Sequence, residues 1–360
     1  MEARIQKLQK ALFSQNDAAE GYLITSPVAR RYLLGFSSTA GTGLILEDAA
    51  YFIVDFRYYE MACHAIRGCK VLLQENLPEQ IKQLCAKHHA STLGVEEQTM
   101  TLSEFDSFTK SLTGLTLVRD GKLSAALERL RLIKDAQEIE AIAAAQALSE
   151  EAYTDLLGIL KAGMTEKQIA LELDFRMRRL GAEDVSFETI VAAGPHSASP
   201  HAHPTDYAVQ PGDLVTMDFG ALLNGYHADM TRTVAIGEPG EEKRRLYETV
   251  LTAQLEAIQA MGPGKEFAAM DRVARRIIDN AGYRGCFGHS LGHGVGLLIH
   301  EFPRLSPSSE EVLSDGMVFS DEPGIYEAGA FGIRIEDTVC LKEGRVHSFM
   351  GKTERDLLIL

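Results

Sequence analysis

Two aspartates flank a predicted β-hairpin turn in the second half of the chain. Residues 214–236 (LVTMDFGALLNGYHADMTRTVAI) contain two strand-like runs on either side of Asn224-Gly225, a dipeptide that favours a two-residue hairpin turn. With this turn, Asp218 and Asp229 lie on one face of the sheet as diagonal neighbours, roughly 7–8 Å apart at the backbone. The corresponding register pairs Leu223 with Tyr226, Asp218 with Thr231 and Asp229 with Gly220.

Two carboxylates that point together from adjacent strands repel each other, and this is costly unless a cation lies between them. A metal site is therefore one interpretation of the hairpin. The alternative is two unrelated surface aspartates on a solvated sheet face. A register shift of one residue would place the pair on the wrong face.

A second pair of acidic residues lies closer to the C-terminus. Residues 316–324 form a strand-like run in which Glu322 is the last regular residue. Residues 331–339 alternate apolar and polar side chains, so Arg334 and Glu336 share one face of a predicted strand. The two glutamates could converge on one site, or Arg334 and Glu336 could form a charged ladder on the protein surface.

Histidines concentrate in a glycine-rich segment. Residues 288–296 contain four glycines, which disfavour a helix and let the backbone approach a site closely. His289, His293 and His300 fall within twelve residues, and His201 lies in a separate Pro-His-Ala-His-Pro run. A single histidine is more often structural than functional, but this density favours a functional site.

The same segment permits a second interpretation. Gly288-His-Ser-Leu-Gly292 matches the G-x-S-x-G turn that carries the nucleophile of many serine hydrolases, with Ser290 as the nucleophile. That turn requires a buried strand before it and a helix after it. Residues 282–287 form a weak strand and residues 292–296 a weak helix, so the flanking sequence disfavours this alternative.

The elements that must position these residues divide the chain into two parts. Residues 1–122 alternate short apolar runs with amphipathic stretches, which is typical of an α/β domain. The Asp120-Gly121 turn marks the predicted boundary, and residues 123–360 form the second domain. The predicted strands are 21–25, 50–54, 70–73, 92–95 and 115–118, with helices at 78–88 and 102–110.

Helices dominate the start of the second part. Asp135 and Glu138 have the spacing of a capping box, and so do Thr165 and Gln168. The second of these helices should end near Leu180-Gly181, because glycine suits the left-handed position after a helix. Two further helices are predicted at 241–261 and 268–281.

Composition narrows the class of protein. The chain has 360 residues, 45% of them hydrophobic, and a formal net charge of −15, which suits two domains with cores of their own. Lysines and arginines are scattered, which argues against a nucleic-acid or anionic membrane partner. No apolar run approaches a spanning helix, and five irregularly spaced cysteines predict reduced thiols in a cytoplasmic enzyme.

The order of these motifs along the chain is more specific than any one of them. P-H-x-x-P, D-F-G, D-x-T-R-T, G-H-G, H-E-x-P, E-P-G-I-Y and R-I-E-D follow one another from Pro200 to Asp337. This order resembles the Xaa-Pro peptidases, prolidase and aminopeptidase P, of the creatinase/methionine-aminopeptidase superfamily. The resemblance covers essentially the whole chain, and Asp55-Phe-Arg-Tyr58 is similar to the creatinase-type N-terminal domain.

The resemblance implies a fold and a set of site residues. We expect an α/β creatinase-like domain at 1–122 and an α+β "pita-bread" metallopeptidase domain at 123–360. The implied ligands of two divalent metal ions are Asp218, Asp229, His293, Glu322 and Glu336, all of which are present. His201, His289, His300, Arg334 and Glu322 match positions that bind substrate or assist catalysis. A homodimer acting on proline-containing peptides or dipeptides is also implied.

Four carboxylates and one imidazole suit hard or borderline dications, first Mn²⁺ and then Co²⁺, Fe²⁺ or Zn²⁺. Two such ions would activate a water molecule for attack on the peptide carbonyl. Glu322 could carry a proton to the leaving nitrogen, and Arg334 could orient Glu336. Thr231, opposite Asp218, is a further supporting candidate. A catalytically silent protein of the same fold remains an alternative, and dipeptidase and aminopeptidase activities are not separated by the sequence.

Overall fold

The computed structural model describes residues 2–14 and 17–360, which form two compact units, Met1–Arg131 and Leu132–Leu360. The predicted boundary after residue 122 coincides with the start of helix α6 (Lys122–Leu132), whereas the units divide at its end. The helix belongs with the first unit because it buries Leu123 and Leu127 and because the Tyr32 hydroxyl donates to the Leu130 carbonyl at 2.9 Å.

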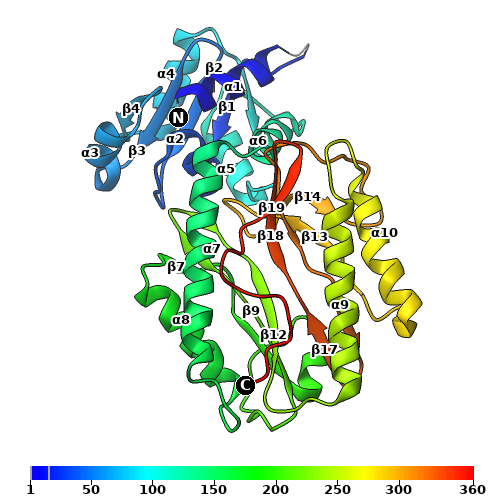
Figure 1. The fold of residues 1–360 in the computed structure, drawn as a ribbon. Coiled ribbons are helices and arrows are strands. Elements are labelled where there is room, and N and C mark those ends of the chain that lie inside the picture. The colour runs from blue at the N-terminus through cyan, green and yellow to red at the C-terminus, as the bar shows by residue number, and fades with distance from the viewer. Residues whose placement is uncertain (1, 15–16) are drawn as a thin grey trace. The chain divides into compact units, whose positions relative to one another are not determined.

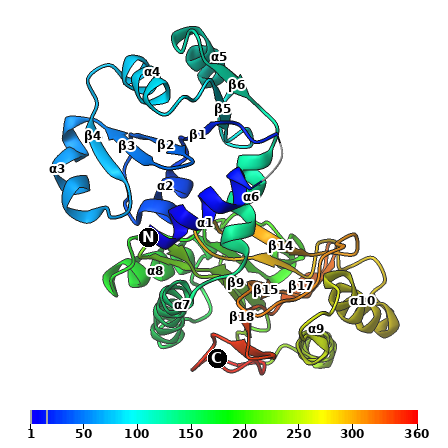
Figure 2. The same cartoon turned by 90° about the horizontal axis from the view of Figure 1, so that it is seen from above.

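The first unit is built around one mixed six-stranded sheet, in the order β4-β3-β2-β1-β5-β6 (Figure 2). β5 and β6 run parallel to each other and to β1, β4 runs parallel to β3, and the β1-β2-β3 meander is antiparallel. The strands are β1 (Gly21–Ile24), β2 (Thr42–Leu46), β3 (Ala50–Val54), β4 (Lys70–Leu73), β5 (Thr92–Val95) and β6 (Thr116–Val118). The helices are α1 (Glu2–Phe13), α2 (Pro27–Leu34), α3 (Phe56–Ala65), α4 (Leu77–Lys87), α5 (Leu102–Ser111) and α6.

The five strands and two helices predicted in this part are all present within a residue or two of their expected ends. The sequence did not predict β2, whose residues are buried throughout and therefore lack the alternation of a half-exposed strand. Leu23, Leu44, Ile53 and Leu93 from four adjacent strands, with Ile81 of α4, form the centre of the core.

The second unit has two halves, each with a pair of helices packed on antiparallel strands (Figure 1). In the first half, α7 (Ala136–Leu157) and α8 (Glu166–Arg179) cover β7 (Asp184–Val185), β8 (Ile190–Ala193), β9 (Leu214–Phe219), β10 (Ala221–Leu223), β11 (Tyr226–His227) and β12 (Met230–Ala235). Both helices begin with the predicted capping boxes, at Asp135–Glu138 and Thr165–Gln168, with each side chain bonded to the other residue's backbone N–H.

In the second half, α9 (Glu241–Ala260) and α10 (Phe267–Ile278) cover the remaining strands. A five-stranded sheet has the order β14-β13-β15-β18-β19, and β16 pairs with β17. These strands are β13 (Gly292–Gly294), β14 (Glu301–Leu305), β15 (Val318–Asp321), β16 (Gly324–Glu327), β17 (Phe331–Arg334), β18 (Asp337–Lys342) and β19 (Arg345–Ser348). Short helices η1 (Gly194–Ala198) and η2 (Asp279–Tyr283) lie in the connections.

The hairpin register that the sequence predicted is confirmed. Leu223 pairs with Tyr226, and Asp218 pairs with Thr231. Across the two halves, the Glu336 N–H donates to the Thr231 carbonyl at 3.1 Å, which joins β12 to the segment between β17 and β18. The predicted continuous strand at 331–339 is therefore divided: it leaves one sheet at Arg334 and enters another at Asp337. Among the described residues, no helix is both long and apolar enough to cross a membrane.

Candidate metal centre

The five candidate ligands come from both halves of the second unit and meet where the halves join. Asp218 lies on β9 and Asp229 immediately before β12, whereas His293 lies on β13. Glu322 directly follows β15, one residue beyond the end of the strand, and Glu336 lies between β17 and β18. No single sheet could present this set, so the bridge between the halves is what brings the residues together.

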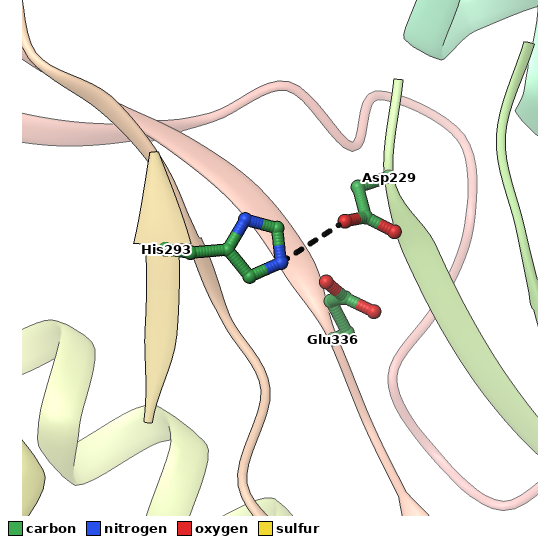
Figure 3. A group of neighbouring side chains, drawn as sticks. All are labelled: Asp229, His293 and Glu336. Carbon is green, nitrogen blue, oxygen red and sulfur yellow. Dashed lines mark ion pairs between the residues drawn. The ribbon is translucent and has the colours of Figure 1, made fainter. Parts of the chain in front are cut away.

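Three of the candidates are close enough to share one cation. Asp229, His293 and Glu336 each offer an oxygen or nitrogen atom, and these atoms lie within 4.8 Å of one another (Figure 3). His293 Nε2 is 3.5 Å from Asp229 Oδ2 and 3.4 Å from Glu322 Oε1. Glu322 therefore extends the cluster beyond the first three residues.

The local backbone fixes which nitrogen of His293 faces the carboxylates. Nδ1 lies 3.1 Å from the Gly294 carbonyl oxygen and must carry the proton to bond with it, so Nε2 presents its lone pair to the cluster. The flanking glycines are needed for close packing: a Cβ on Gly292 would lie 1.9 Å from the Ser320 carbonyl oxygen, and one on Gly294 would lie 2.1 Å from that of Phe302.

Ser320 links two of the candidate ligands. Its hydroxyl accepts the His293 backbone N–H at 3.0 Å and donates to Glu322 Oε1 at 3.0 Å. Because Ser320 is fully buried on β15, this pair of bonds holds the Glu322 carboxylate toward the His293 ring.

Asp218 enters the cluster through Arg334. The Arg334 guanidinium donates to Asp218 Oδ2 at 2.5 Å, whereas Oδ1 of the same carboxylate is buried and has no hydrogen-bond partner in the described structure. A buried carboxylate oxygen without a donor is costly unless a cation contacts it. The unpaired Oδ1 is thus an observation that favours a bound metal ion.

The role predicted for Arg334 differs in its direct partner. Sequence reasoning placed Arg334 against Glu336, but its guanidinium reaches that residue only through the Thr231 hydroxyl. Arg334 Nε donates to Thr231 Oγ1 at 3.0 Å, and Oγ1 donates to Glu336 Oε2 at 2.6 Å. The Thr231 hydroxyl therefore lies between the two side chains.

The pKa values of the carboxyl groups indicate that nearby positively charged side chains do not balance the negative charge of the cluster. Burial, together with repulsion from the neighbouring carboxylates, raises the pKa of Asp229 and of Glu336 well above their ordinary values. Burial raises the pKa of Glu322 to about 7 against the opposing effect of Arg334. A donor set of carboxylate oxygens and one imidazole, with one nearby arginine, fits divalent ions of hard or borderline character.

His289 lies beside the cluster in a fixed tautomer. Nδ1 lies 2.9 Å from the Ser290 carbonyl oxygen and donates to it, so Nε2 accepts the Tyr326 hydroxyl proton at 3.0 Å. The Tyr326 oxygen in turn accepts from Arg334 at 2.7 Å. Burial, with a smaller contribution from the charge on Arg334, lowers the pKa of His289 to about 4, so the ring is neutral near pH 7.

His300 also faces the cluster. Its ring centroid lies 4.3 Å from that of His293 in an edge-on arrangement. Burial, followed by the neighbouring charge of His293, lowers the pKa of His300 to about 4. The ring therefore serves near neutral pH as a neutral donor and acceptor.

His201 is exposed, and the carbonyl of the preceding residue, Pro200, accepts from Arg334, which places the His201 loop beside the cluster. Two residues hold its loop. Arg334 donates to the Pro200 carbonyl at 3.2 Å, and the fully buried Glu166 carboxylate accepts from the Thr205 N–H at 2.9 Å.

The Glu166 carboxylate accepts several hydrogen bonds around the His201 loop. Besides Thr205, it accepts from the Ala193 N–H at 2.8 Å and from His196 Nδ1 at 2.9 Å. These bonds tie the end of β8 and the loop after η1 to the first turn of α8. The His201 loop is therefore positioned by a helix terminus outside the cluster.

The comparisons with known proteins agree with this arrangement. The model of Metallopeptidase family M24 matches residues 140–343, and that of the Creatinase/Prolidase N-terminal domain matches residues 4–133. The chain belongs to metallopeptidase family M24. Its fold is the creatinase-type α/β domain followed by the pita-bread domain that the sequence predicted, and the protein is a metal-dependent peptidase.

Individual relatives cover nearly the whole chain. The Xaa-Pro dipeptidase of Pyrococcus furiosus is 38% identical over 99% of this chain and 100% of its own length. A solved Xaa-Pro dipeptidase from Bacillus anthracis is 35% identical, with a TM-score of 0.94 and 99% of each chain covered. An X-Pro aminopeptidase structure from Thermotoga maritima is 35% identical, with a TM-score of 0.89 over 95% of this chain and 98% of its own.

The alternative prediction, a serine hydrolase with Ser290 as its nucleophile, is wrong. The segment before Ser290 contains no strand, and the residues after it form β13 rather than a helix. The sharp strand-to-helix turn that exposes such a nucleophile is therefore absent at Ser290. Of the two glycines in the motif, Gly292 belongs to β13 and serves its close packing against Ser320.

Sequence reasoning missed several residues that organise the site. Tyr326 was quoted only within E-P-G-I-Y, although it connects Arg334 to His289. Ser320 and Glu166 carry no recognisable motif, and their roles follow only from burial and from the number of donors or acceptors around them. Thr231, predicted as a supporting residue, does bridge Glu336 and Arg334.

Proposed function

We propose that this protein hydrolyses the peptide bond between an N-terminal residue and proline, using two divalent metal ions held by Asp218, Asp229, His293, Glu322 and Glu336. The observation that carries the proposal is the buried carboxylate cluster with one unpaired oxygen on Asp218 and raised carboxyl pKa values. The preference for proline is supported by the names of the relatives that cover the whole chain.

The metal ions, when bound, would supply a water nucleophile that is active near neutral pH and positive charge that stabilises a developing oxyanion. Mn²⁺ suits the oxygen-rich donor set best, with Co²⁺, Fe²⁺ and Zn²⁺ as alternatives. The remaining chemistry belongs to the side chains around the cluster.

Glu322 is the proton carrier in this proposal. A carboxylate can accept and release a proton, so Glu322 can deliver one to the leaving proline nitrogen. Ser320 holds Oε1 of this carboxylate at 3.0 Å, and Oε2 lies 4.0 Å from His289 Nδ1.

The histidines around the cluster position the substrate. His300, packed against His293, is placed to donate a hydrogen bond to the scissile carbonyl oxygen as negative charge develops there. His201 contributes from the opposite loop, and His289 takes part through its bond to Tyr326. Arg334 holds the Asp218 carboxylate in place so that its Oδ1 stays directed to a cation.

A peptide bond to proline has no N–H on the leaving side. A peptidase that recognises that N–H therefore binds such substrates poorly. A site that holds the carbonyl side of the scissile bond with metal ions and histidines does not need an N–H on the leaving side.

The experiment measures hydrolysis of Ala-Pro and of Ala-Pro-Ala-Ala after exhaustive chelation and after addition of Mn²⁺, with bound metal counted by elemental analysis. We expect chelation to abolish activity and Mn²⁺ to restore it at about two ions per chain. Hydrolysis that persists without metal would overturn the proposal, and metal binding without cleavage of either peptide would identify a silent binding protein.

A matched pair of variants tests whether the activity depends on the carboxylate cluster. Asp229→Asn removes one candidate ligand and should abolish both the restored activity and at least one bound ion. Asp206→Asn changes an exposed aspartate that pairs with Lys167 and should leave both unchanged. The two peptides separate dipeptidase from aminopeptidase activity, and sedimentation of the same samples tests the predicted homodimer.

A further inference from the structure

A cavity of about 450 Å³ lies in the first unit, outside the catalytic unit. This volume falls in the range of small-ligand pockets, roughly 300–1,000 Å³. Its walls combine apolar side chains with two charges of opposite sign. The lining residues are Val95, Glu97, Gln98, Met100, Leu102, Phe105 and Arg119.

The cavity occupies a position where α/β sheets commonly bind ligands. β5 ends at Val95 and the parallel β6 ends at Val118, so the lining residues that follow both strands lie at their carboxyl ends. Ligands in open α/β sheets bind in the crevice outside the carboxyl ends of the strands. The loop after β5 is ordered by bonds from the Thr99 and Met100 N–H groups to the Glu96 carbonyl.

The two charged residues on the cavity wall are exposed, and their side chains form no hydrogen bond or ion pair within the described part of the chain. The Arg119 guanidinium lies 4.7 Å from the centroid of the Phe105 ring, and neither a hydrogen bond nor an ion pair to a protein acceptor satisfies it there. The Glu97 carboxylate is likewise unpaired among those residues. A planar guanidinium stacked on an aromatic ring keeps its donors free for a carboxylate.

The neighbouring polar groups are already committed to the fold. The Glu96 carboxylate accepts from the Thr25 and Ser26 N–H groups at 2.5 and 2.9 Å. The first turn of α5 is closed by the capping box of Thr101 and Glu104. Glu97 and Arg119 are therefore the groups left to recognise a charged ligand.

The apolar part of the wall fits a hydrophobic side chain. Leu102 is 74% exposed at the first position of α5, and Phe105 and Met100 are half-buried beside it. Covering such surface is favourable because it removes apolar area from water. A ligand with an apolar body and both charges would use the whole wall.

We propose that this cavity binds a zwitterionic amino acid or dipeptide with an apolar side chain. The carboxylate bonds to Arg119, the ammonium group to Glu97, and the side chain covers Leu102 and Phe105. The site is distinct from the metal cluster and does not depend on the proposed peptidase activity.

The experiment follows the methyl resonance of Met100 in the full-length protein labelled with ¹³C-methyl methionine, assigned with the Met100→Leu variant. L-leucine and L-alanyl-L-leucine are titrated separately, which distinguishes an amino acid from a dipeptide as the ligand. We expect a saturable shift of the Met100 signal with at least one of them. N-acetyl-leucine and leucinamide, each lacking one charge, should bind roughly tenfold more weakly.

Matched variants test the two charges. Arg119→Gln and Glu97→Gln should each weaken binding roughly tenfold, whereas exposed Arg129→Gln and Glu60→Gln should not. A Met100 signal that does not move with either ligand overturns the proposal. So does binding that is equally tight for the neutralised analogues or that survives both pocket variants. Because the readout is local to the cavity and needs no turnover, failure of the peptidase proposal would leave this result unaffected.

Discussion

Two buried acidic regions lie side by side in the second unit, and adjacent residues of one motif divide between them. Glu336 belongs to the carboxylate cluster of Asp218, Asp229, Glu322 and Glu336, where burial and mutual repulsion raise its pKa well above its ordinary value. Asp337, the next residue, belongs to an arginine-paired region.

In the arginine-paired region, Arg232 donates to Asp337 Oδ1 at 2.9 Å and Arg355 Nε donates to Oδ2 at 2.8 Å. Burial alone would raise the pKa of Asp337, but Arg232 and Arg355 outweigh it and hold the pKa below its ordinary value. The comparison teaches that two arginines neutralise the single structural carboxylate, whereas in the cluster one arginine faces four carboxylates and most of their charge is left for ions from outside.

The largest expected effect comes from breaking the arginine-paired region. Arg232→Met leaves Asp337 buried with only one arginine and should lower the free energy of unfolding by about 3–5 kcal/mol. Urea denaturation of metal-free protein measures it. Exposed Arg345→Met is the control and should change little, and a fully stable Arg232→Met protein would contradict the structural role.

Neutralising a residue of the carboxylate cluster should raise the free energy of unfolding of the metal-free protein, whereas Arg232→Met lowers it. Folding raises the pKa of Glu322 from 4.5 to about 7, so the metal-free folded protein binds more protons than the unfolded chain between these values. This contribution is fully present below pH 4.5 and is lost as pH rises through 7. Glu322→Gln should therefore match the wild type near pH 4 and exceed its stability by roughly 3 kcal/mol near pH 8.

The measurement is the free energy of unfolding of metal-free wild type and variant across this pH range, with exposed Glu310→Gln as the control. A constant difference between Glu322→Gln and the wild type would show that the carboxyl does not ionise against its surroundings.

The Thr231 hydroxyl, which joins Glu336 to Arg334 within the carboxylate cluster, gives a smaller effect. Thr231→Val removes the bond to Glu336 and the acceptor for Arg334. Loss of such a supporting bond should weaken metal affinity about 10–100-fold. Thr231→Ser keeps the hydroxyl and should retain most of the affinity, which calorimetric metal titration can compare. Equal loss in both variants would assign the effect to packing instead.

The smallest effect is expected outside both regions, at Glu166. Glu166→Gln weakens the bonds to Thr205 and His196 that hold the His201 loop. We expect kcat to fall by about tenfold, the order of one charged hydrogen bond, with bound metal unchanged. Glu172→Gln, at a half-exposed position where only the bond to Arg176 is lost, should keep full activity. Loss of metal from Glu166→Gln would contradict a role limited to the loop.

Local chemistry explains which expectations were confirmed. The capping boxes at Asp135 and Thr165 and the hairpin register around Asn224-Gly225 depend on residues close in sequence, so short-range rules predict them. The order of the motifs then identified the fold and the family. The strand assigned to 331–339 was partly wrong because alternation does not reveal that a strand changes sheets at Glu336.

The sequence by itself determined the capped helix starts, the hairpin, the two-part organisation and the identity of the residues that gather at the cluster, whereas the helix predicted at 268–281 ends at Ile278. Only the tertiary structure decided that Arg334 bonds to Asp218, that Tyr326 fixes His289, and that Glu336 stays unpaired by arginine while Asp337 does not. The physical reason is that the pKa and partner of a buried charge depend on which distant strands meet around it, and neighbours in sequence can face opposite surroundings across a single peptide bond.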